Sequence, residues 1–176
     1  PPADAATITY RLHYPADLDL DLHGGRQFLE NDRLTISKER VPLKVGASAG
    51  GVCAHPEFLR ASRYVQAGNE QIITMARSIA GSETDPAARV RLLADWVYHN
   101  LEKRPVIGLP DALTTLRNRR GDCNEHASLF AALARSLDIP TAIATGVTLQ
   151  NDAFYYHAWN EVCLDGRWYS LDTTTD

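Results

Sequence analysis

Two alternating segments near the C-terminus, residues 154–164 and 167–173, are separated by the dipeptide Asp165-Gly166. Aspartate followed by glycine tolerates the left-handed backbone of a two-residue type I′ turn, so the pattern predicts an antiparallel hairpin. A turn of this length fixes the register, with Leu164 opposite Arg167 and Trp159 opposite Asp172. The hairpin therefore determines which distant residues become neighbours in the last third of the chain.

In this register one face of the hairpin carries His157, Trp159, Asp172 and Thr174, because alternate residues of a strand share a face. His157 and Asp172 are diagonal neighbours, so the carboxylate can accept a proton from the imidazole and fix its tautomer. A surface ion pair would produce the same pattern. Asn160 is an alternative partner for His157, but it lies on the opposite face of the strand, and Asp172 is preferred.

Residues 122–137 predict a helix that begins at Cys123. Asp122 and Glu125 have the spacing of a capping box, with aspartate in place of serine or threonine. At a helix start the sulfur lies beside unpaired N–H groups and the positive end of the helix dipole, which lower a thiol pKa and favour a nucleophilic thiolate. The alternative is a small buried packing residue. The buried stripe of this helix is expected to be Ala127, Phe130, Leu133, Ala134 and Leu137.

A zinc site is the main chemical alternative, because Cys123-x-x-His126 resembles half of one. His157 and Cys163 are the candidates for the other half. Six residues along a straight strand separate them by about 20 Å, so they cannot share an ion. We therefore expect no metal ligands here, and we interpret His126 as a helix-surface or packing residue. Cys163 is expected to be structural, facing Trp168 across the hairpin.

The N-terminal part of the chain is expected to be β-structured. Residues 1–50 form either the edge of a preceding β-domain or an accessory to the core, and residues 51–68 form a linker in which Cys53 carries no signal. Three short alternating segments with no helix between them support this interpretation: residues 6–12, 18–22 and 33–37.

Residues 69–176 are expected to form an α+β core, with helices followed by strands. Helix starts are predicted at Asn69, at Asp85-Pro86 and at Asp111, since these residues favour the first positions of a helix. Gly81 is the predicted stop of the first helix. A further strand, residues 141–149, precedes the hairpin.

Composition excludes several classes of protein. The chain has 176 residues, of which 44% are apolar and 23% charged, and a net charge of −4. These values are typical of a globular domain, and they argue against nucleic-acid binding as the main activity. No apolar run approaches the length of a membrane span. Three cysteines allow at most one disulfide. Since the chain starts with Pro1 rather than methionine, we expect a processed protein or an excised piece.

Three motifs together make the chain resemble the transglutaminase-like superfamily, in particular its bacterial branch. They are Arg120–Ala127 (RGDCNEHA), Tyr156–Val162 (YHAWNEV) and Trp168–Thr174 (WYSLDTT). The resemblance covers about residues 69–176 and implies a papain-like α+β fold. It implies further that Cys123 is the nucleophile, His157 the general base and Asp172 the orienting acid, with no metal or organic cofactor. Members of this family usually continue beyond this point, so the core is expected to be truncated at its C-terminus.

The expected function is thiol-dependent acyl transfer on a protein or peptide amide, either as hydrolysis or as cross-linking to an amine. The backbone N–H of Cys123 is the candidate oxyanion donor. Trp159 and Tyr155 are candidates for the cleft wall, although core packing would explain them equally well. The alternative function is a non-catalytic binding module within a larger bacterial protein. The resemblance is compatible with a cytoplasmic or a cell-envelope location.

Overall fold

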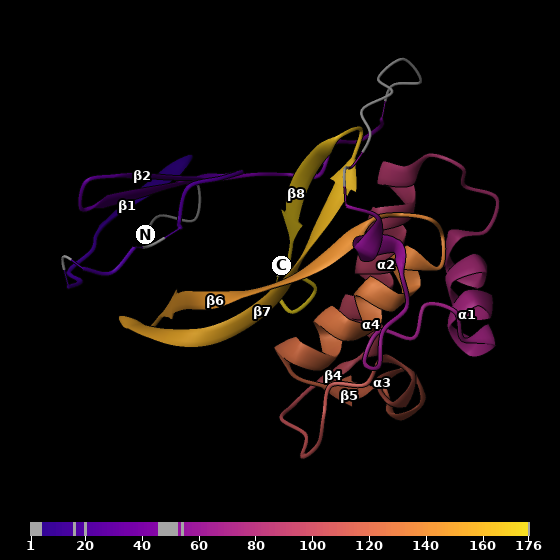
Figure 1. The fold of residues 1–176 in the computed structure, drawn as a ribbon. Coiled ribbons are helices and arrows are strands. Elements are labelled where there is room, and N and C mark those ends of the chain that lie inside the picture. The colour runs from indigo at the N-terminus through magenta and orange to yellow at the C-terminus, as the bar shows by residue number, and fades with distance from the viewer. Residues whose placement is uncertain (1–4, 16, 20, 46–52, 54, 176) are drawn as a thin grey trace. The chain divides into compact units, whose positions relative to one another are not determined.

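A computed structural model describes residues 5–15, 17–19, 21–45, 53 and 55–175. The chain divides into two units, Pro1–Arg40 and Val41–Asp176, each of which is described by itself (Figure 1). Of the predicted linker, residues 51–68, the structure describes residues 53 and 55–68, and the predicted boundaries of the linker stay a prediction.

The N-terminal unit is a three-stranded antiparallel sheet of strands β1 (Thr7–Arg11), β2 (Gln27–Glu30) and β3 (Arg33–Ser37), in the order β1-β3-β2. The predictions for residues 6–12 and 33–37 are confirmed. The predicted strand at 18–22 is wrong, because its described residues form no strand and the second strand lies at Gln27–Glu30 instead. Strand β2 pairs with β3 through a tight turn in which Asn31 adopts a positive φ of 54°. Residues 27–30 thus find a pairing partner in β3, whereas the described residues among 18–22 have none.

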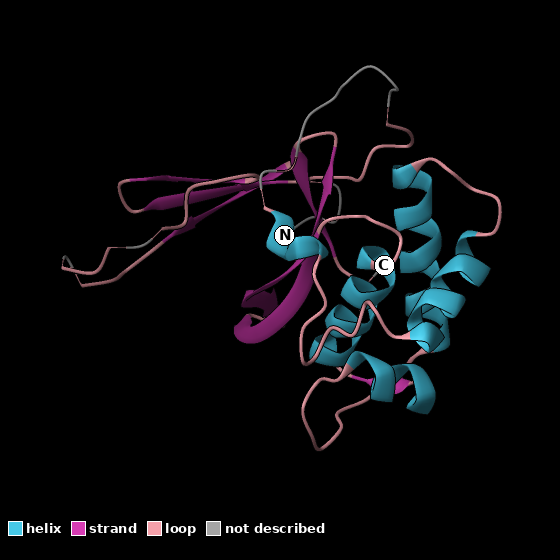
Figure 2. Ribbon diagram, turned by 45° about the vertical axis from the view of Figure 1, so that its right-hand side comes forward, coloured by secondary structure: helices cyan, strands magenta, loops and turns pink. Residues whose placement is uncertain are grey.

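Three helices of the second unit begin at the predicted caps. They are α1 (Glu70–Ala80), α2 (Pro86–Asn100) and α3 (Ala112–Asn118), and the side chains of Asn69, Asp85 and Asp111 accept hydrogen bonds from the first turns. A short 3₁₀ helix, η1 (Pro56–Leu59), precedes them. Two short parallel strands, β4 (Glu102–Lys103) and β5 (Arg120–Gly121), flank α3 in the sequence. Figure 2 shows the helices gathered on one side of the main sheet of this unit.

Helix α4 (Cys123–Arg135) is the central element of the second unit. It packs against the main sheet and against the other helices of the unit (Figure 1). The sequence predicted one buried stripe, but every residue from 125 to 134 is buried. The reason is that α4 is covered on all sides, which a pattern of apolar residues on one face does not reveal.

The main sheet has three antiparallel strands in the order β6-β7-β8: β6 (Thr141–Gln150), β7 (Ala153–Leu164) and β8 (Arg167–Leu171). The predicted register is confirmed, since Leu164 pairs with Arg167 and Cys163 pairs with Trp168. Asp165 and Gly166 have φ values of 56° and 74°, as a two-residue turn of this kind requires. Strand β8 ends at Leu171, so Asp172 follows directly after its last paired residue.

These elements make the second unit α+β, as predicted. A disulfide joins Cys53 to Cys163 on β7 and leaves Cys123 as a free thiol. The sequence carried no signal for this role of Cys53, whose sulfur is bonded to a strand far along the chain. Within the described residues, no helix combines the length and the apolar composition that crossing a bilayer would need.

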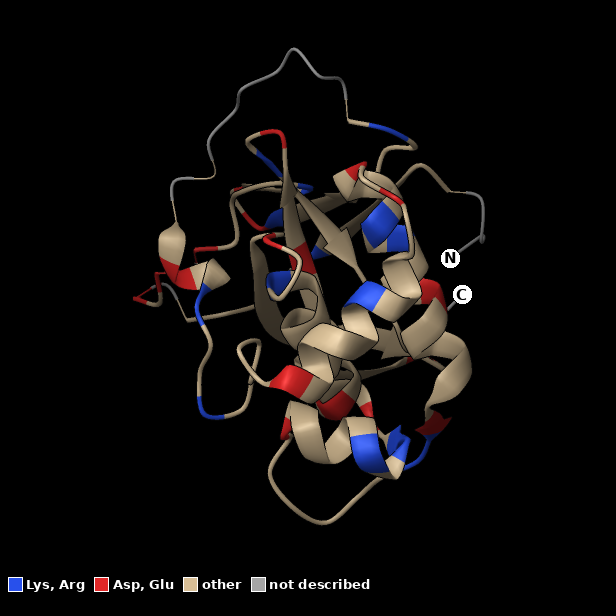
Figure 3. Ribbon diagram, turned by 90° about the vertical axis from the view of Figure 1, so that its right-hand side faces the viewer, with Lys and Arg blue, Asp and Glu red and all other residues tan. Residues whose placement is uncertain are grey.

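Acidic and basic positions are interspersed along the ribbon in Figure 3.

Candidate functional site

Cys123 is the first residue of α4, and a capping box fixes the helix start. The Asp122 side chain accepts a hydrogen bond from the Asn124 N–H at 3.0 Å, and the Glu125 carboxylate accepts one from the Asp122 N–H at 2.9 Å. Gly121 lies so close to Glu125 that a Cβ on residue 121 would overlap the Cβ and Cγ of Glu125. In the sequence Gly121-Asp122-Cys123, the glycine is therefore required for packing against Glu125, and the aspartate caps the helix.

The pKa of the Cys123 thiol lies above its ordinary value, which corrects the expected lowered value. Burial of the sulfur has the largest effect and raises the pKa, and the Asp122 carboxylate raises it further. The backbone N–H groups of Ala158, Asn124 and Cys123 act in the opposite direction, as expected for a helix start, but they do not outweigh burial. The resting sulfur is therefore a thiol at neutral pH.

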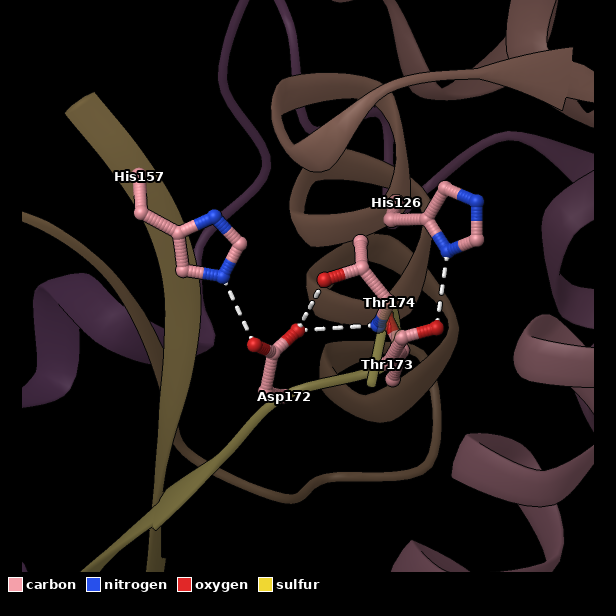
Figure 4. A network of polar contacts seen from close by, with 5 residues as sticks. All are labelled: His126, His157, Asp172, Thr173 and Thr174. Atoms are coloured by element: carbon pink, nitrogen blue, oxygen red, sulfur yellow. Dashed lines mark hydrogen bonds and ion pairs between the residues drawn. The ribbon is translucent and has the colours of Figure 1, made fainter. Parts of the chain in front are cut away.

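His157 and Asp172 are joined by a hydrogen bond of 2.6 Å between Nε2 and Oδ2 (Figure 4). Both side chains are largely buried, with exposed fractions of 14% and 24%. An ionised carboxylate can only accept, so Nε2 carries the proton and donates. In the neutral ring, Nδ1 is then the nitrogen with a free lone pair.

The Asp172 carboxylate is held in its ionised form by further donors. Its Oδ1 accepts hydrogen bonds from the Thr174 N–H at 2.8 Å and the Thr174 hydroxyl at 2.6 Å (Figure 4). Burial alone would raise the pKa of Asp172, but the hydrogen bonds from Thr174 and His157 outweigh it and place the pKa below its ordinary value. The carboxylate that orients His157 is therefore charged at neutral pH.

The sulfur of Cys123 lies beside strand β7 at the position next to His157. The Ala158 N–H donates toward this sulfur, which is how it lowers the thiol pKa. The structure thus brings Cys123 to the backbone of the residue that follows His157, and it joins His157 to Asp172 directly. Asn160 does not compete for His157, because its amide group donates to the carbonyls of Ala127 and Ala142 at 3.0 and 3.3 Å.

Two aromatic residues were predicted as candidates for a cleft wall. Trp159 stacks on His157, with ring centroids 6.3 Å apart and an interplanar angle of 21°. Its indole also lies over Gly146, where a Cβ would come within 2.9 Å of the ring. Tyr155 is more than half exposed on the extended part of the β6–β7 hairpin. Trp159 is therefore placed against the imidazole, whereas Tyr155 lies on an open surface.

Sequence reasoning missed two contacts near the site. The Tyr156 hydroxyl donates to Asn124 Oδ1 at 2.9 Å and so links β7 to the start of α4. His126 is fully buried, and its Nδ1 lies 2.9 Å from the Thr173 carbonyl oxygen (Figure 4). Of the two alternatives for His126, helix surface is wrong, because the side chain is buried as the packing alternative expected. The position of Tyr156 inside the histidine motif was a signal for the first contact, but the sequence carried none for the second.

Comparison with known proteins assigns the same region to one family. A family model described as the transglutaminase-like superfamily matches residues 73–173. A protein of Haemophilus influenzae without an assigned function is 29% identical over 98 residues, which cover 53% of this chain and 26% of that protein. Mouse kyphoscoliosis peptidase is 25% identical over 127 residues, which cover 62% of this chain and 18% of the peptidase. The chain thus spans about a quarter or less of the length of these relatives.

Two solved structures share the fold. A candidate cysteine protease from Cytophaga hutchinsonii aligns with a TM-score of 0.65 and 23% identity, over 84% of this chain and 60% of that one. The periplasmic domain of TgpA from Pseudomonas aeruginosa aligns with a TM-score of 0.55 and 19% identity, over 81% of this chain and 52% of that one. At these identities the likeness concerns the fold alone.

Proposed function

The chain belongs to the transglutaminase-like superfamily, with a papain-like α+β fold, and from that premise we propose that it catalyses thiol-dependent acyl transfer on a protein or peptide amide. Cys123 is the nucleophile, His157 the general base and Asp172 the residue that orients the base. The description of a structural neighbour as a candidate cysteine protease agrees with this class of reaction. Hydrolysis and transfer to an amine are the two outcomes that the same intermediate allows.

One observation carries the proposal: a buried imidazole is held by a charged carboxylate at 2.6 Å, on the strand that the Cys123 sulfur adjoins. A nucleophile, a base and an orienting group are the parts of this chemistry. Since Nε2 is engaged by Asp172, Nδ1 is the atom that receives a proton. The proposal requires that Nδ1 and the sulfur come within hydrogen-bond reach in the complex with substrate.

In the first half of the reaction, the Cys123 sulfur attacks the carbonyl carbon of the amide while its proton moves to His157 Nδ1. The C–N bond then breaks, the imidazolium returns the proton to the leaving nitrogen, and a thioester remains on Cys123. Asp172 stabilises the transient imidazolium without taking its proton. The backbone N–H of Cys123 is the proposed donor to the developing oxyanion.

In the second half, water or an amine attacks the thioester. His157 accepts a proton from the attacking group and delivers it to the departing sulfur, which restores the thiol. Water releases a carboxylic acid, and a lysine amine forms a cross-link. The proposed chemistry needs no metal ion or organic cofactor, because Cys123 supplies the nucleophile and His157 carries every proton that is transferred.

The raised thiol pKa decides how the nucleophile forms. A sulfur that is protonated at neutral pH must lose its proton during the attack, so His157 acts as a base in that step rather than as the partner of a preformed thiolate. General-base assistance of this kind contributes about 10²- to 10⁴-fold to a rate. The reaction should therefore depend on His157 more steeply than it would with a resting thiolate.

The activity test uses peptides containing glutamine, with and without an added amine, and identifies products by mass spectrometry. We expect turnover by the wild type, loss of turnover in Cys123→Ala, and a loss of about 10³- to 10⁴-fold in Asp172→Asn, which keeps the shape but not the charge. Asp95→Asn is the matched control, since Asp95 is exposed and remote from Asp172 in the sequence. Full turnover by Cys123→Ala would end the proposal.

A second test measures the reactivity of the Cys123 thiol without a substrate. Cys53 and Cys163 are joined in a disulfide, so iodoacetamide alkylation reports on Cys123. We expect His157→Gln to slow alkylation at neutral pH roughly tenfold or more, whereas the exposed control His99→Gln leaves it unchanged. Equal rates in the wild type and both variants, together with no turnover, would favour the alternative of a non-catalytic binding module.

A further inference from the structure

His126 occupies a position that the proposed mechanism does not use. It lies on α4, in the first turn after Cys123, and its side chain is fully buried. Its Nδ1 lies 2.9 Å from the Thr173 carbonyl oxygen (Figure 4). A carbonyl oxygen accepts only, so Nδ1 must carry a proton and donate to it.

The partner of His126 belongs to the segment that carries the orienting acid. Strand β8 ends at Leu171, and residues 172–175 continue as irregular backbone. Within this segment, Thr174 donates twice to Asp172. The bond from His126 to Thr173 lies between these two residues and ties the segment to α4 (Figure 4).

We propose that His126 is a positioning residue, whose Nδ1–H holds the Thr173 carbonyl and thereby fixes the Asp172 carboxylate against His157. One helix then carries both the nucleophile and the group that anchors the orienting acid. This inference rests on the proposed function, because it concerns the geometry of that site. His126 acts through Asp172 and takes no part in the chemical steps.

The form of His126 supports this role. Its pKa lies below the ordinary value, chiefly because burial disfavours the charged ring, and Lys103 adds to the effect. In the neutral ring with a proton on Nδ1, the other nitrogen has none, and among the described residues this buried Nε2 has no hydrogen-bond partner. An apolar side chain would avoid that unpaired nitrogen, so packing alone does not account for a histidine here.

Two variants separate positioning from packing. His126→Asn keeps an amide donor close to the place of Nδ1, and His126→Phe keeps the ring volume but removes the donor. Both are first checked for folding by circular dichroism. The readouts are the downfield proton NMR resonance of the His157 Nε2–H, which reports its hydrogen bond to Asp172, and kcat and KM on a peptide substrate.

We expect His126→Phe to weaken or lose the resonance and to lower kcat by about tenfold to a hundredfold with little change in KM, as for a misplaced catalytic group. His126→Asn should keep the resonance and most of kcat. Retention of both by His126→Phe would overturn the inference, and so would equal losses in the two variants. The resonance does not depend on turnover, so it distinguishes failure of this inference from failure of the proposed function.

A measurement on the wild type keeps the inference testable if His126→Phe does not fold. Nitrogen-15 NMR distinguishes the two neutral tautomers of a histidine. We expect His126 to carry its proton on Nδ1. A proton on Nε2 would overturn the inference, because the Thr173 carbonyl would then receive no donor from this ring.

Discussion

Gly121 shows how a single residue without a side chain shapes the start of the nucleophile's helix. A Cβ on residue 121 would overlap the Glu125 side chain that closes the capping box. We expect Gly121→Ala to lower the free energy of unfolding by about 2–3 kcal/mol, from the lost cap and the forced repacking. Urea unfolding measures the change. Gly68→Ala is the control, because a Cβ there meets nothing within 4 Å, and an equally large loss in that variant would contradict this explanation.

His126 should also make the stability of the protein depend on pH. Burial is the largest cause of its lowered pKa, and Lys103 also disfavours the charged ring, whereas the hydrogen bond to Thr173 and the charges of Asp172 and Asp122 favour it without outweighing burial. As the pH falls below about 6.5, the unfolded chain binds a proton that the folded chain does not, so stability falls by at most about 1.4 kcal/mol per pH unit from this group. Above that pH the group has no effect.

The measurement is urea unfolding of the wild type and His126→Asn between about pH 7 and pH 5.5. The wild type should lose more stability over this range, because the variant lacks the titrating ring. Parallel curves of unfolding free energy against pH for the two proteins would show that another group causes the loss of stability at low pH.

At the scale of elements, Asn160 joins α4, β6 and β7. It is fully buried, and its amide donates to Ala127 on α4 and Ala142 on β6. Asn160→Asp would turn a carboxylate toward two carbonyl oxygens, and we expect a loss of about 3 kcal/mol or more in the free energy of unfolding. The control is Asn151→Asp at the exposed β6–β7 turn, which should change stability little. Similar losses in the two variants would refute the account.

The elements that follow local rules were predictable from the sequence. The caps at Asn69, Asp85 and Asp111 act within one helical turn, and the Asp165-Gly166 turn fixes its own register. The strand predicted at residues 18–22 failed, because alternation shows that a segment can form a strand but not that a partner is available. The burial of α4 on all sides depends on how elements pack, which periodicity in one helix does not report.

The contacts of the candidate site also fall into two groups, those that follow from local rules and those that depend on how the elements pack. The contact between His157 and Asp172 followed from hairpin register alone, since both residues belong to one hairpin and its end. The contact from His126 to Thr173 and the link from Tyr156 to Asn124 join a helix to the sheet. Such contacts depend on how α4 is placed on the sheet, which no local pattern encodes. The proposed triad depends on the same placement through Cys123.

At the scale of the whole molecule, the disulfide is the longest-range covalent constraint. It closes a loop with a sequence separation of 110 residues. We expect its removal in Cys53→Ser to cost about 2–5 kcal/mol, because the open chain gains freedom in the unfolded state. Thermal melts with and without dithiothreitol provide the measurement, with Cys123→Ser as the control that should respond to the reductant like the wild type. Identical melts under both conditions would show that the bond does not form.

The disulfide has a practical consequence for anyone who prepares this protein. Disulfides form readily in secretory and periplasmic routes and rarely in a reducing cytosol. Material from a reducing host would contain three free sulfhydryls, whereas correctly oxidised material would contain one, since two of the three cysteines are bonded to each other. A sulfhydryl titration of the purified sample is therefore a quick quality test, and labelling yields should be interpreted only after it.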